Sequence, residues 1–341
     1  MTLRLKVKTK DWRSAQDELQ LRVPGLVPVA KGNGYGFGLD VLAREATRMR
    51  ADALAVGTAH EVAPIRFAGW PGDVIILNPW RPGDELATSL LSDPKVVTTV
   101  SRVLDVNQLA REHPGSRVLL ELDTSMHRHG MSTEELSQLE LGNLTVEGWT
   151  IHLPADGSLD EAAELCEAAL SCRMGAVWLS HLSEEDYRSL SDRLETRTFM
   201  RVGTRLWLGA PQTFTTTSTV LDVHPIKRGG TLGYHQVRAS RDGYIVVASG
   251  GTAHGIALAA PVPQRSIRQR LTTVADGVLR ATGQTLSPFT IKGRKRPFAE
   301  PPHMHSSMLF VPGRTPGVQV GDEVPVTCRM TTTTFDEIIW E

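Results

Sequence analysis

The sequence predicts an α/β fold: a (β/α)8 TIM-type barrel followed by a C-terminal, mostly antiparallel β-domain. Two observations support this prediction. Between residues 26 and 202, short apolar runs alternate with amphipathic stretches until there are eight runs, which is the pattern of a closed parallel barrel. After about residue 212, β-rich segments are separated by Gly and Pro turns, as is typical of antiparallel sheets.

The eight predicted barrel strands are apolar or β-branched on both faces, as strands buried on both sides of a parallel sheet should be. They comprise residues 26–30, 53–57, 74–77, 96–100, 117–122, 144–152, 176–181 and 198–202. An amphipathic segment predicted to be helical follows each of the first seven, including 132–141. An open doubly wound sheet is the alternative interpretation of the same alternation.

These boundaries predict a barrel domain at 9–211 and a β-domain at 212–341, with one helical interlude, SIRQRLTTVADGVLR, at 266–280. The N-terminal strand at 2–8 precedes the first barrel strand and is free to pair with the second domain.

Composition restricts the function classes. The chain has 341 residues, 40% of them hydrophobic, and a formal net charge of −1. Near-neutrality argues against a nucleic-acid or membrane-binding surface, and no apolar run reaches the roughly 18 residues of a membrane span. The N-terminus lacks an apolar signal core, and the three cysteines show no CxxC spacing. We therefore expect a reduced, cytoplasmic protein.

The stretch PVAKGNGYGFG, residues 28–38, places Lys31 at the C-terminal end of the first barrel strand. Active sites of barrels lie on that face, and a lysine that loses its proton there can form an imine with an aldehyde. The glycines permit tight turns, and Tyr35 can donate a hydrogen bond to a phosphate. The alternative is an ordinary surface lysine beside a glycine-rich loop.

PVAKGNGYGFG resembles the pyridoxal 5′-phosphate (PLP) motif of alanine racemases, which runs AxxKANAYGHG or close to it. Members of this family are barrel-plus-β-domain enzymes that act on a small-molecule amino acid. Further segments follow in the family's order, so the resemblance covers most of the chain. It implies that Lys31 holds PLP and that Tyr35 contacts the phosphate.

ELDTSMHRHGM (121–131) resembles the family's KxDTGMxRxG segment, which implies that Arg128 helps to bind the substrate. Where the family often has a lysine, this chain has Glu121, and we expect that carboxylate to pair with Arg128. His127 and His129 permit a metal, but no third ligand is identifiable, so no metal is predicted.

Two strand ends complete the implied cofactor pocket. GWTIHLP (148–154) resembles the family's GxxTHF strand and places His152 in the barrel mouth. MRVGTRLWLGAP (200–211) resembles VRxGIxLYG and places Arg201 at the pyridine nitrogen of PLP, with Gly203 and Thr204 offering N–H groups to the phosphate. Arginine has donors only, so that nitrogen must stay unprotonated.

The second domain carries two implied site residues. GGTLGYHQ (229–236) resembles the family's GxxVSYG, whose tyrosine is the second catalytic base, so Tyr234 becomes the partner of Lys31. In the family this tyrosine comes from the other subunit of a head-to-tail homodimer. EPPHMHSSMLFVP (300–312) aligns Met304 with a residue that faces the substrate; His303 and His305 beside it permit a metal on one strand face.

Some family positions are absent here. The tyrosine of GYADGY has no counterpart in SGGTAHGIAL (249–258), and Phe335 stands near the position of a C-terminal tyrosine. Ser183 either contacts the phosphate or caps the following helix through an S-x-x-D arrangement with Asp186.

The sequence therefore predicts a PLP-dependent amino-acid racemase. Three alternatives stay open: another PLP reaction on the same fold, such as a metal-assisted D-amino-acid lyase or dehydratase; a PLP-binding protein without turnover; and a metal-dependent barrel hydrolase built on the HxH pairs.

Overall fold

The computed structural model describes residues 2–258 and 285–341. The chain divides into two compact units: unit 1 comprises Met1–Trp12 and Ala210–Glu341, and unit 2 comprises Arg13–Gly209. The predicted helical interlude at 266–280 lies outside the described residues. No helix in the described ranges is long and apolar enough to cross a membrane.

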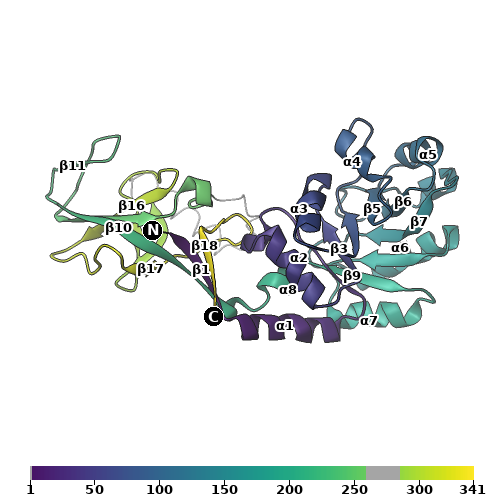
Figure 1. The fold of residues 1–341 in the computed structure, drawn as a ribbon, viewed down its shortest axis with the longest axis horizontal. Helices are drawn as coiled ribbons and strands as arrows, with labels where there is room; N and C mark the ends of the chain where they lie inside the picture. The colour runs from purple at the N-terminus through teal and green to yellow at the C-terminus, as the bar shows by residue number, and fades with distance from the viewer. Residues whose placement is uncertain (1, 259–284) are drawn as a thin grey trace. The chain divides into compact units, whose positions relative to one another are not determined.

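Unit 2 is built on an eight-stranded, all-parallel sheet that closes into a barrel, which confirms the predicted fold class (Figure 1). The strands, in sheet order, are β2 (Leu26–Pro28), β9 (Thr198–Val202), β8 (Ala176–Leu179), β7 (Thr145–Ile151), β6 (Arg117–Leu122), β5 (Val96–Val100), β4 (Asp73–Ile76) and β3 (Ala53–Val56). Each falls on a predicted run.

The barrel closes at a short seam between β2 and β3, the two end strands of the sheet order. Val29 forms an isolated parallel bridge with Ala55, and the Ala30 N–H donates to the Ala55 carbonyl at 2.8 Å. Because β2 has only three residues, few backbone hydrogen bonds hold this seam.

Helices line the outside of the barrel strands (Figure 1). They are α1 (Thr9–Arg22), α2 (Leu39–Arg48), α3 (Val62–Phe67), α4 (Glu85–Leu90), α5 (Val103–Glu112), α6 (Leu159–Cys172), α7 (Glu184–Arg193) and α8 (Thr204–Leu208). Short 3-10 turns are η1 (Gly34–Gly36), η2 (Ala59–Glu61) and η3 (Glu134–Gln138).

The stretch 132–141 is the exception among the predicted helices, because it forms only η3. Its N-terminal side is held by Met131, which pairs with Leu122 of β6. Its C-terminal side enters a turn in which the Leu144 N–H donates to the Leu141 carbonyl. Asn107 of α5 donates to the Gln138 carbonyl at 3.2 Å and accepts from the Glu140 N–H at 2.9 Å, so these backbone groups are used outside a helical ladder.

A hydrophobic layer fills the barrel interior. Its members are Val27, Val29, Ala53, Ala55, Ile75, Val97, Leu119 and Trp178, with Leu77 and Phe199 packed against them. The rings of Trp178 and Phe199 stack with centroids 4.1 Å apart. This layer closes the barrel below the strand ends, as in other barrels of this class.

Unit 1 is a β-structure around a sheet of order β16–β13–β10–β1–β18, in which β17 also pairs with β10. Its strands are β1 (Leu3–Val7), β10 (Phe214–Ile226), β11 (Thr231–Leu232), β12 (Val237–Arg238), β13 (Gly243–Ser249), β14 (Leu286–Ile291), β15 (Arg294–Pro297), β16 (Ser306–Pro312), β17 (Glu323–Pro325) and β18 (Glu337–Trp340); η4 (Pro211–Thr213) and η5 (Thr252–His254) are short turns.

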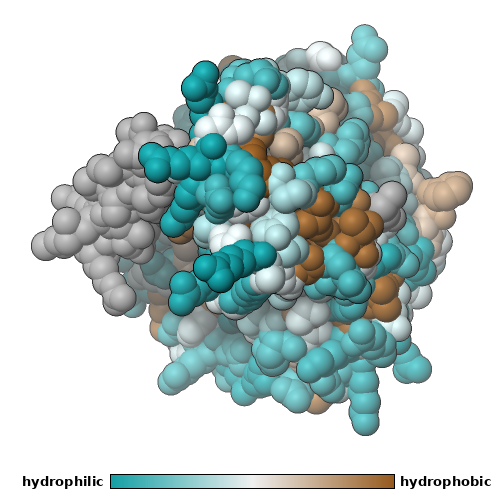
Figure 2. All heavy atoms as spheres, turned by 90° about the vertical axis from the view of Figure 1, so that its left-hand side faces the viewer, coloured by the Kyte–Doolittle hydropathy of each residue, from teal (hydrophilic) through white to brown (hydrophobic). Residues whose placement is uncertain are grey.

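Among the described strands of unit 1, pairing is antiparallel except between β1 and β18. The N-terminal strand β1 lies between β10 and β18, so the two ends of the chain meet in one sheet. Leu3, Val246, Phe289 and Leu309 belong to its buried core. The face seen in Figure 2 is mainly hydrophilic, with hydrophobic residues gathered in small patches.

Candidate active site

The alternation of side chains along the barrel strands determines which residues line the candidate site in unit 2. Side chains two residues apart on a strand share a face. Four residues of the hydrophobic layer lie near the ends of their strands: Val29, Leu119, Trp178 and Phe199. The residues two positions after them are Lys31, Glu121, Ser180 and Arg201, respectively. The layer above the hydrophobic core at the carboxyl end of the barrel is therefore polar, and it contains two of the predicted site residues.

Lys31 lies three residues beyond the end of β2 and precedes η1. The residue reaches solvent, but protein surrounds much of its side chain. The pKa of its amine is lowered, chiefly because burial disfavours the ammonium, and the positive charges of Arg128 and Arg201 add to this effect. The Glu61 carboxylate opposes it. Lys31 is thus pushed toward the neutral, nucleophilic amine.

Tyr35 lies inside η1 with a left-handed backbone, φ 56°, and its ring is buried. Its phenol hydrogen-bonds Thr204, and burial raises its pKa to about 12. A Cβ on Gly203 would overlap the Tyr35 hydroxyl. Because only glycine leaves that space, Tyr35, Gly203 and Thr204 form one close cradle at the start of α8.

Arg201 lies at the end of β9 and is 7% exposed. Its Nη2 donates to the Ile151 carbonyl at 3.1 Å and to the Ser180 hydroxyl at 3.4 Å, whereas its buried Nε has no partner among the described residues. Burial lowers its pKa to about 10, against the raising influence of Glu121. A guanidinium N–H therefore lies buried without an acceptor.

His152, at the end of β7, joins Arg201 through a residue that sequence analysis did not identify. Ser180 Oγ lies 2.7 Å from His152 Nδ1. His181, also unidentified, packs edge-on against His152 with ring centroids 5.0 Å apart. Burial and nearby positive charge, Arg201 first, lower the pKa of His152 to about 2. The imidazole is consequently neutral.

The two unidentified residues do have a sequence signal. Ser180 and His181 close the predicted strand 176–181, so the strand-end rule that selects Lys31 applies to them equally. His181 has a left-handed backbone, φ 66°, and burial lowers its pKa.

Arg128 is exposed on the loop after β6. Its positive charge lowers the pKa of Lys31, His152 and Arg201. The clustered positive charge at the strand ends favours an anionic ligand such as a phosphate or carboxylate.

The expected pairing between Glu121 and Arg128 is not present. Glu121 is 2% exposed, and its Oε2 has no hydrogen-bond partner among the described residues. Burial raises its pKa, while Arg201 and Arg128 lower it. The reason is geometric: Glu121 is the inward residue of β6, whereas Arg128 lies on the exposed loop beyond that strand.

Ser183 is the N-cap of α7. Its hydroxyl accepts from the Asp186 N–H at 3.0 Å and donates to Asp186 Oδ2 at 2.7 Å. Of the two roles considered for Ser183, capping is the one with observed contacts.

Tyr234 and Met304 belong to unit 1. Tyr234 lies between β11 and β12 with 83% of its side chain exposed. Its N–H donates to buried Glu300 at 2.8 Å, and Glu300 also bonds His303 Nε2 at 2.7 Å. The rings of Tyr234 and His303 lie 4.8 Å apart. Met304 is 64% exposed.

One histidine of each HxH pair binds a neighbouring carboxylate in this structure. Besides the His303–Glu300 contact, His127 Nδ1 lies 2.9 Å from Asp123 Oδ2. No group of three or more His, Cys, Asp or Glu side chains suited to a metal occurs in the described ranges.

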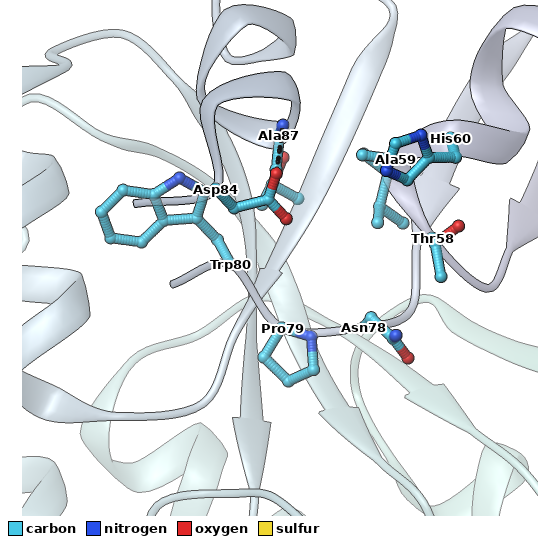
Figure 3. Close-up of a pocket in the computed structure, with 10 residues that line it drawn as sticks. Thr58, Ala59, His60, Asn78, Pro79, Trp80, Asp84 and Ala87 are labelled. Carbon is cyan, nitrogen blue, oxygen red and sulfur yellow. Dashed lines mark hydrogen bonds between the residues drawn. The ribbon is translucent and has the colours of Figure 1, made fainter. Parts of the chain in front are cut away.

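A separate pocket of about 140 Å³ lies beside β4. Figure 3 shows Asn78, Pro79 and Trp80 along one segment, Thr58 and His60 across from them, and Asp84 bonded to the Ala87 N–H. None of the residues lining it is a predicted site residue.

The residues of unit 2 fit PLP. The cradle of Tyr35, Gly203 and Thr204 suits a phosphate, the Lys31 amine suits an aldehyde, and the unpaired Nε of buried Arg201 suits a neutral ring nitrogen as acceptor. Fold and site together define a parallel-barrel protein whose strand ends gather one activated lysine and a buried arginine.

Comparison with known proteins narrows this class. The family model "Alanine racemase, N-terminal domain" matches residues 9–191, more than half of the chain. The chain belongs to the alanine racemase family. An alanine racemase of Citrifermentans bemidjiense is 28% identical over 157 residues, 42% of this chain and 40% of the relative. One of Corynebacterium efficiens is 26% identical over 263 residues, 69% of this chain and 70% of the relative.

Solved structures agree on the fold. The alanine racemase of Bartonella henselae with covalently bound pyridoxal phosphate has a TM-score of 0.72 at 15% identity, with all of both chains covered. That of Clostridium difficile 630 has a TM-score of 0.70 at 17% identity over 95% of this chain and 86% of that one. The match to the first relative spans only two-fifths of its length.

Proposed function

We propose that this protein is a PLP-dependent amino-acid racemase that interconverts L- and D-amino acids by a two-base mechanism. The observation that supports it most directly is the relationship of Lys31 to Arg201. The amine's pKa is lowered by burial and by the charge of Arg201, whose Nε lacks an acceptor. Family membership and the covalently bound pyridoxal phosphate of the Bartonella henselae relative agree with it.

In this proposal unit 2 binds and orients the cofactor. Lys31 would hold it covalently, and Tyr35, Gly203 and Thr204 would bind its phosphate, while the Ser183 hydroxyl stays in the cap of α7. Arg201 would donate its Nε–H to the ring nitrogen, which as an acceptor would stay unprotonated. His152 stays neutral. It binds Ser180, which in turn accepts from Arg201, and so helps to hold both side chains in place. When bound, PLP supplies an electron sink that acidifies the α-proton of an amino acid.

Proton transfer falls to two side chains. The Lys31 amine moves the α-proton on one face, because its lowered pKa favours the neutral amine that can accept a proton. Tyr234 holds and moves a proton on the other face. Arg128 binds the substrate carboxylate, since a guanidinium pairs with carboxylates in a fixed fork, and the Met304 backbone faces the same group.

Exposed Tyr234 agrees with a head-to-tail homodimer in which it serves the partner's site, and we propose that assembly and a cytoplasmic location. The metal-assisted alternative is not favoured by any ligand set in the described residues.

Visible absorbance and deuterium exchange test this function. Protein purified with PLP should be yellow, and Lys31→Ala should abolish that absorbance while Lys95→Ala, whose ammonium bonds the Pro71 carbonyl, keeps it. Tyr234→Phe should keep the colour but strongly slow solvent deuterium uptake at the α-carbon of one enantiomer. The matched control is Tyr244→Phe, whose hydroxyl donates to the Arg314 carbonyl. Normal racemisation by Tyr234→Phe would refute the second-base assignment.

A further inference from the structure

Glu61 makes three backbone contacts at the barrel seam. Its Oε1 accepts from the Gly32 N–H at 2.6 Å. Its Oε2 accepts from the N–H groups of Gly57 at 2.5 Å and Thr58 at 3.2 Å. Gly32 directly follows Lys31, whereas Gly57 and Thr58 follow β3, so one carboxylate connects the ends of the two strands that close the barrel.

The contacts leave little free space around this carboxylate. A Cβ on Gly57 would lie 3.0 Å from Glu61 Oε2 and 3.3 Å from the Lys31 Cβ. Glycine at 57 thus lets the carboxylate, the β3 backbone and the lysine stem approach closely. Charge-assisted bonds to backbone N–H groups are stronger than neutral ones, and β2 itself contributes few bonds to the seam.

Thr58 and Glu61 also form a capping box at the start of η2. That motif accounts for the bond to the Thr58 N–H, but it does not account for the bond that crosses the seam to Gly32. The crossing bond is therefore an additional role of the same side chain.

We propose that Glu61 is a positioning residue: by binding Gly32 across the seam it fixes Lys31 at the mouth of the barrel and holds a negative charge beside its amine. This inference rests on the proposed function for its catalytic meaning, but the contacts stand without it. Lys31 is also faced by Arg128 from the loop after β6, by Arg201 from β9, and by His152 and His181 from the ends of β7 and β8.

The charge has a predictable direction. Glu61 raises the pKa of Lys31, against burial and the two arginines. Glu61→Gln removes this charge. Burial, Arg128 and Arg201 remain, and all three lower the pKa of Lys31, so its titration midpoint should move further down.

Two measurements on the full-length, cofactor-free protein test the proposal without turnover. Competitive labelling with trace acetic anhydride across pH, read peptide by peptide, gives the titration midpoint of each lysine. Glu61→Gln should lower the Lys31 midpoint by about half a unit or more. Backbone hydrogen exchange should become about tenfold or more faster in the peptides around residues 32 and 57, because a charge-assisted bond is lost.

Two further variants separate the effect of the Glu61 charge from the effect of its hydrogen bonds. Glu61→Asp keeps the charge but is one methylene shorter, so it should speed exchange while leaving the Lys31 midpoint near that of the wild type. Glu135→Gln is the matched control, because its carboxylate accepts from the Ser132 N–H at 2.8 Å and is not among the charges that shift Lys31; it should change neither.

An unchanged Lys31 midpoint together with unchanged exchange in Glu61→Gln would overturn the proposal. If the Gln variant does not fold, unchanged backbone exchange in Glu61→Asp would overturn it instead. Failure of the proposed function looks different. A wild-type protein that stays colourless with PLP, but whose Lys31 midpoint still depends on Glu61, would refute the racemase and leave the positioning role intact.

Discussion

Ser180 and His152 share a hydrogen bond in which the serine Oγ lies 2.7 Å from the imidazole Nδ1. The same hydroxyl is the acceptor for Arg201 Nη2 at 3.4 Å. Since the guanidinium only donates, Arg201 occupies one lone pair of the serine oxygen, and we expect the serine proton to be directed to Nδ1. This order would make Nδ1 an acceptor and place the proton of the neutral imidazole on Nε2.

Replacing Ser180 by Ala should therefore release the tautomer of His152. Loss of this part-buried bond should lower the free energy of unfolding by about 1–3 kcal/mol, and nitrogen NMR of labelled histidine should show a mixture of tautomers in place of one. Ser89→Ala, which removes a hydroxyl bonded to the Leu86 carbonyl on an exposed helix, is the control. A single unchanged tautomer in the Ser180 variant would contradict the assigned proton order.

The pKa of His152 predicts acid sensitivity. The folded pKa is about 2, below an unfolded value near 6.5, so the unfolded state binds more protons between these limits. The contribution of His152 to stability is complete above the unfolded pKa and declines as pH falls below it. Between pH 6.5 and 5, the wild type should lose about 1–2 kcal/mol more than His152→Gln in denaturant titrations. Exposed His224→Gln should behave like the wild type.

Gly203 should not tolerate a side chain. In Gly203→Ala the new Cβ would overlap the Tyr35 hydroxyl, so the ring must shift, at a cost of about 1–3 kcal/mol. PLP affinity, measured by absorbance titration, should fall with it, because the cradle is displaced. Gly175→Ala, where a Cβ would meet only the Gly148 Cα at 3.4 Å, should leave PLP affinity unchanged.

Ser183→Ala distinguishes the two roles of that serine. Loss of the cap should destabilise the protein by about 1 kcal/mol, while PLP affinity should stay within twofold of the wild type, because Asp186 already uses the hydroxyl as donor and acceptor. A tenfold loss of PLP affinity would instead establish a phosphate contact.

Glu300→Ala should free the loop that carries Tyr234. It would leave the Tyr234 N–H and His303 Nε2 without their shared acceptor, which costs about 1–3 kcal/mol and should appear as faster backbone exchange at residues 233–236. Glu337→Ala, which removes an exposed ion pair with Arg4, should leave exchange at those residues unchanged.

Sequence patterns were sufficient to predict the barrel, because its strands are short runs that are apolar on both faces. Such runs and their lengths can be recognised without knowledge of the neighbouring strands. Lys31 was accessible for a related reason: it stands at a strand end, where barrels place their sites. His152 and Arg201 were identified because their segments resemble those of the alanine racemase family. Ser180 and His181 obey the same rule but lack the distinctive chemistry that draws attention to a lysine.

Other features depend on partners that no local pattern encodes. Glu61 shows a capping box in sequence, but its bond to Gly32 exists only because the barrel closes and brings the two strand ends together. The expected Glu121–Arg128 ion pair does not form for the converse reason. Glu121 lies inside the barrel strand and Arg128 on the loop after it, so Arg128 acts on Glu121 through its charge without a hydrogen bond. The helix predicted at 132–141 was shortened by tertiary anchors at both of its ends.

The high pKa of Tyr35 has a consequence for kinetics. A phenol that keeps its proton to about pH 12 is a constant donor through the whole range in which enzymes are assayed. We therefore expect it to produce no inflection in a rate profile within that range, so that an alkaline loss of turnover would indicate another ionising group.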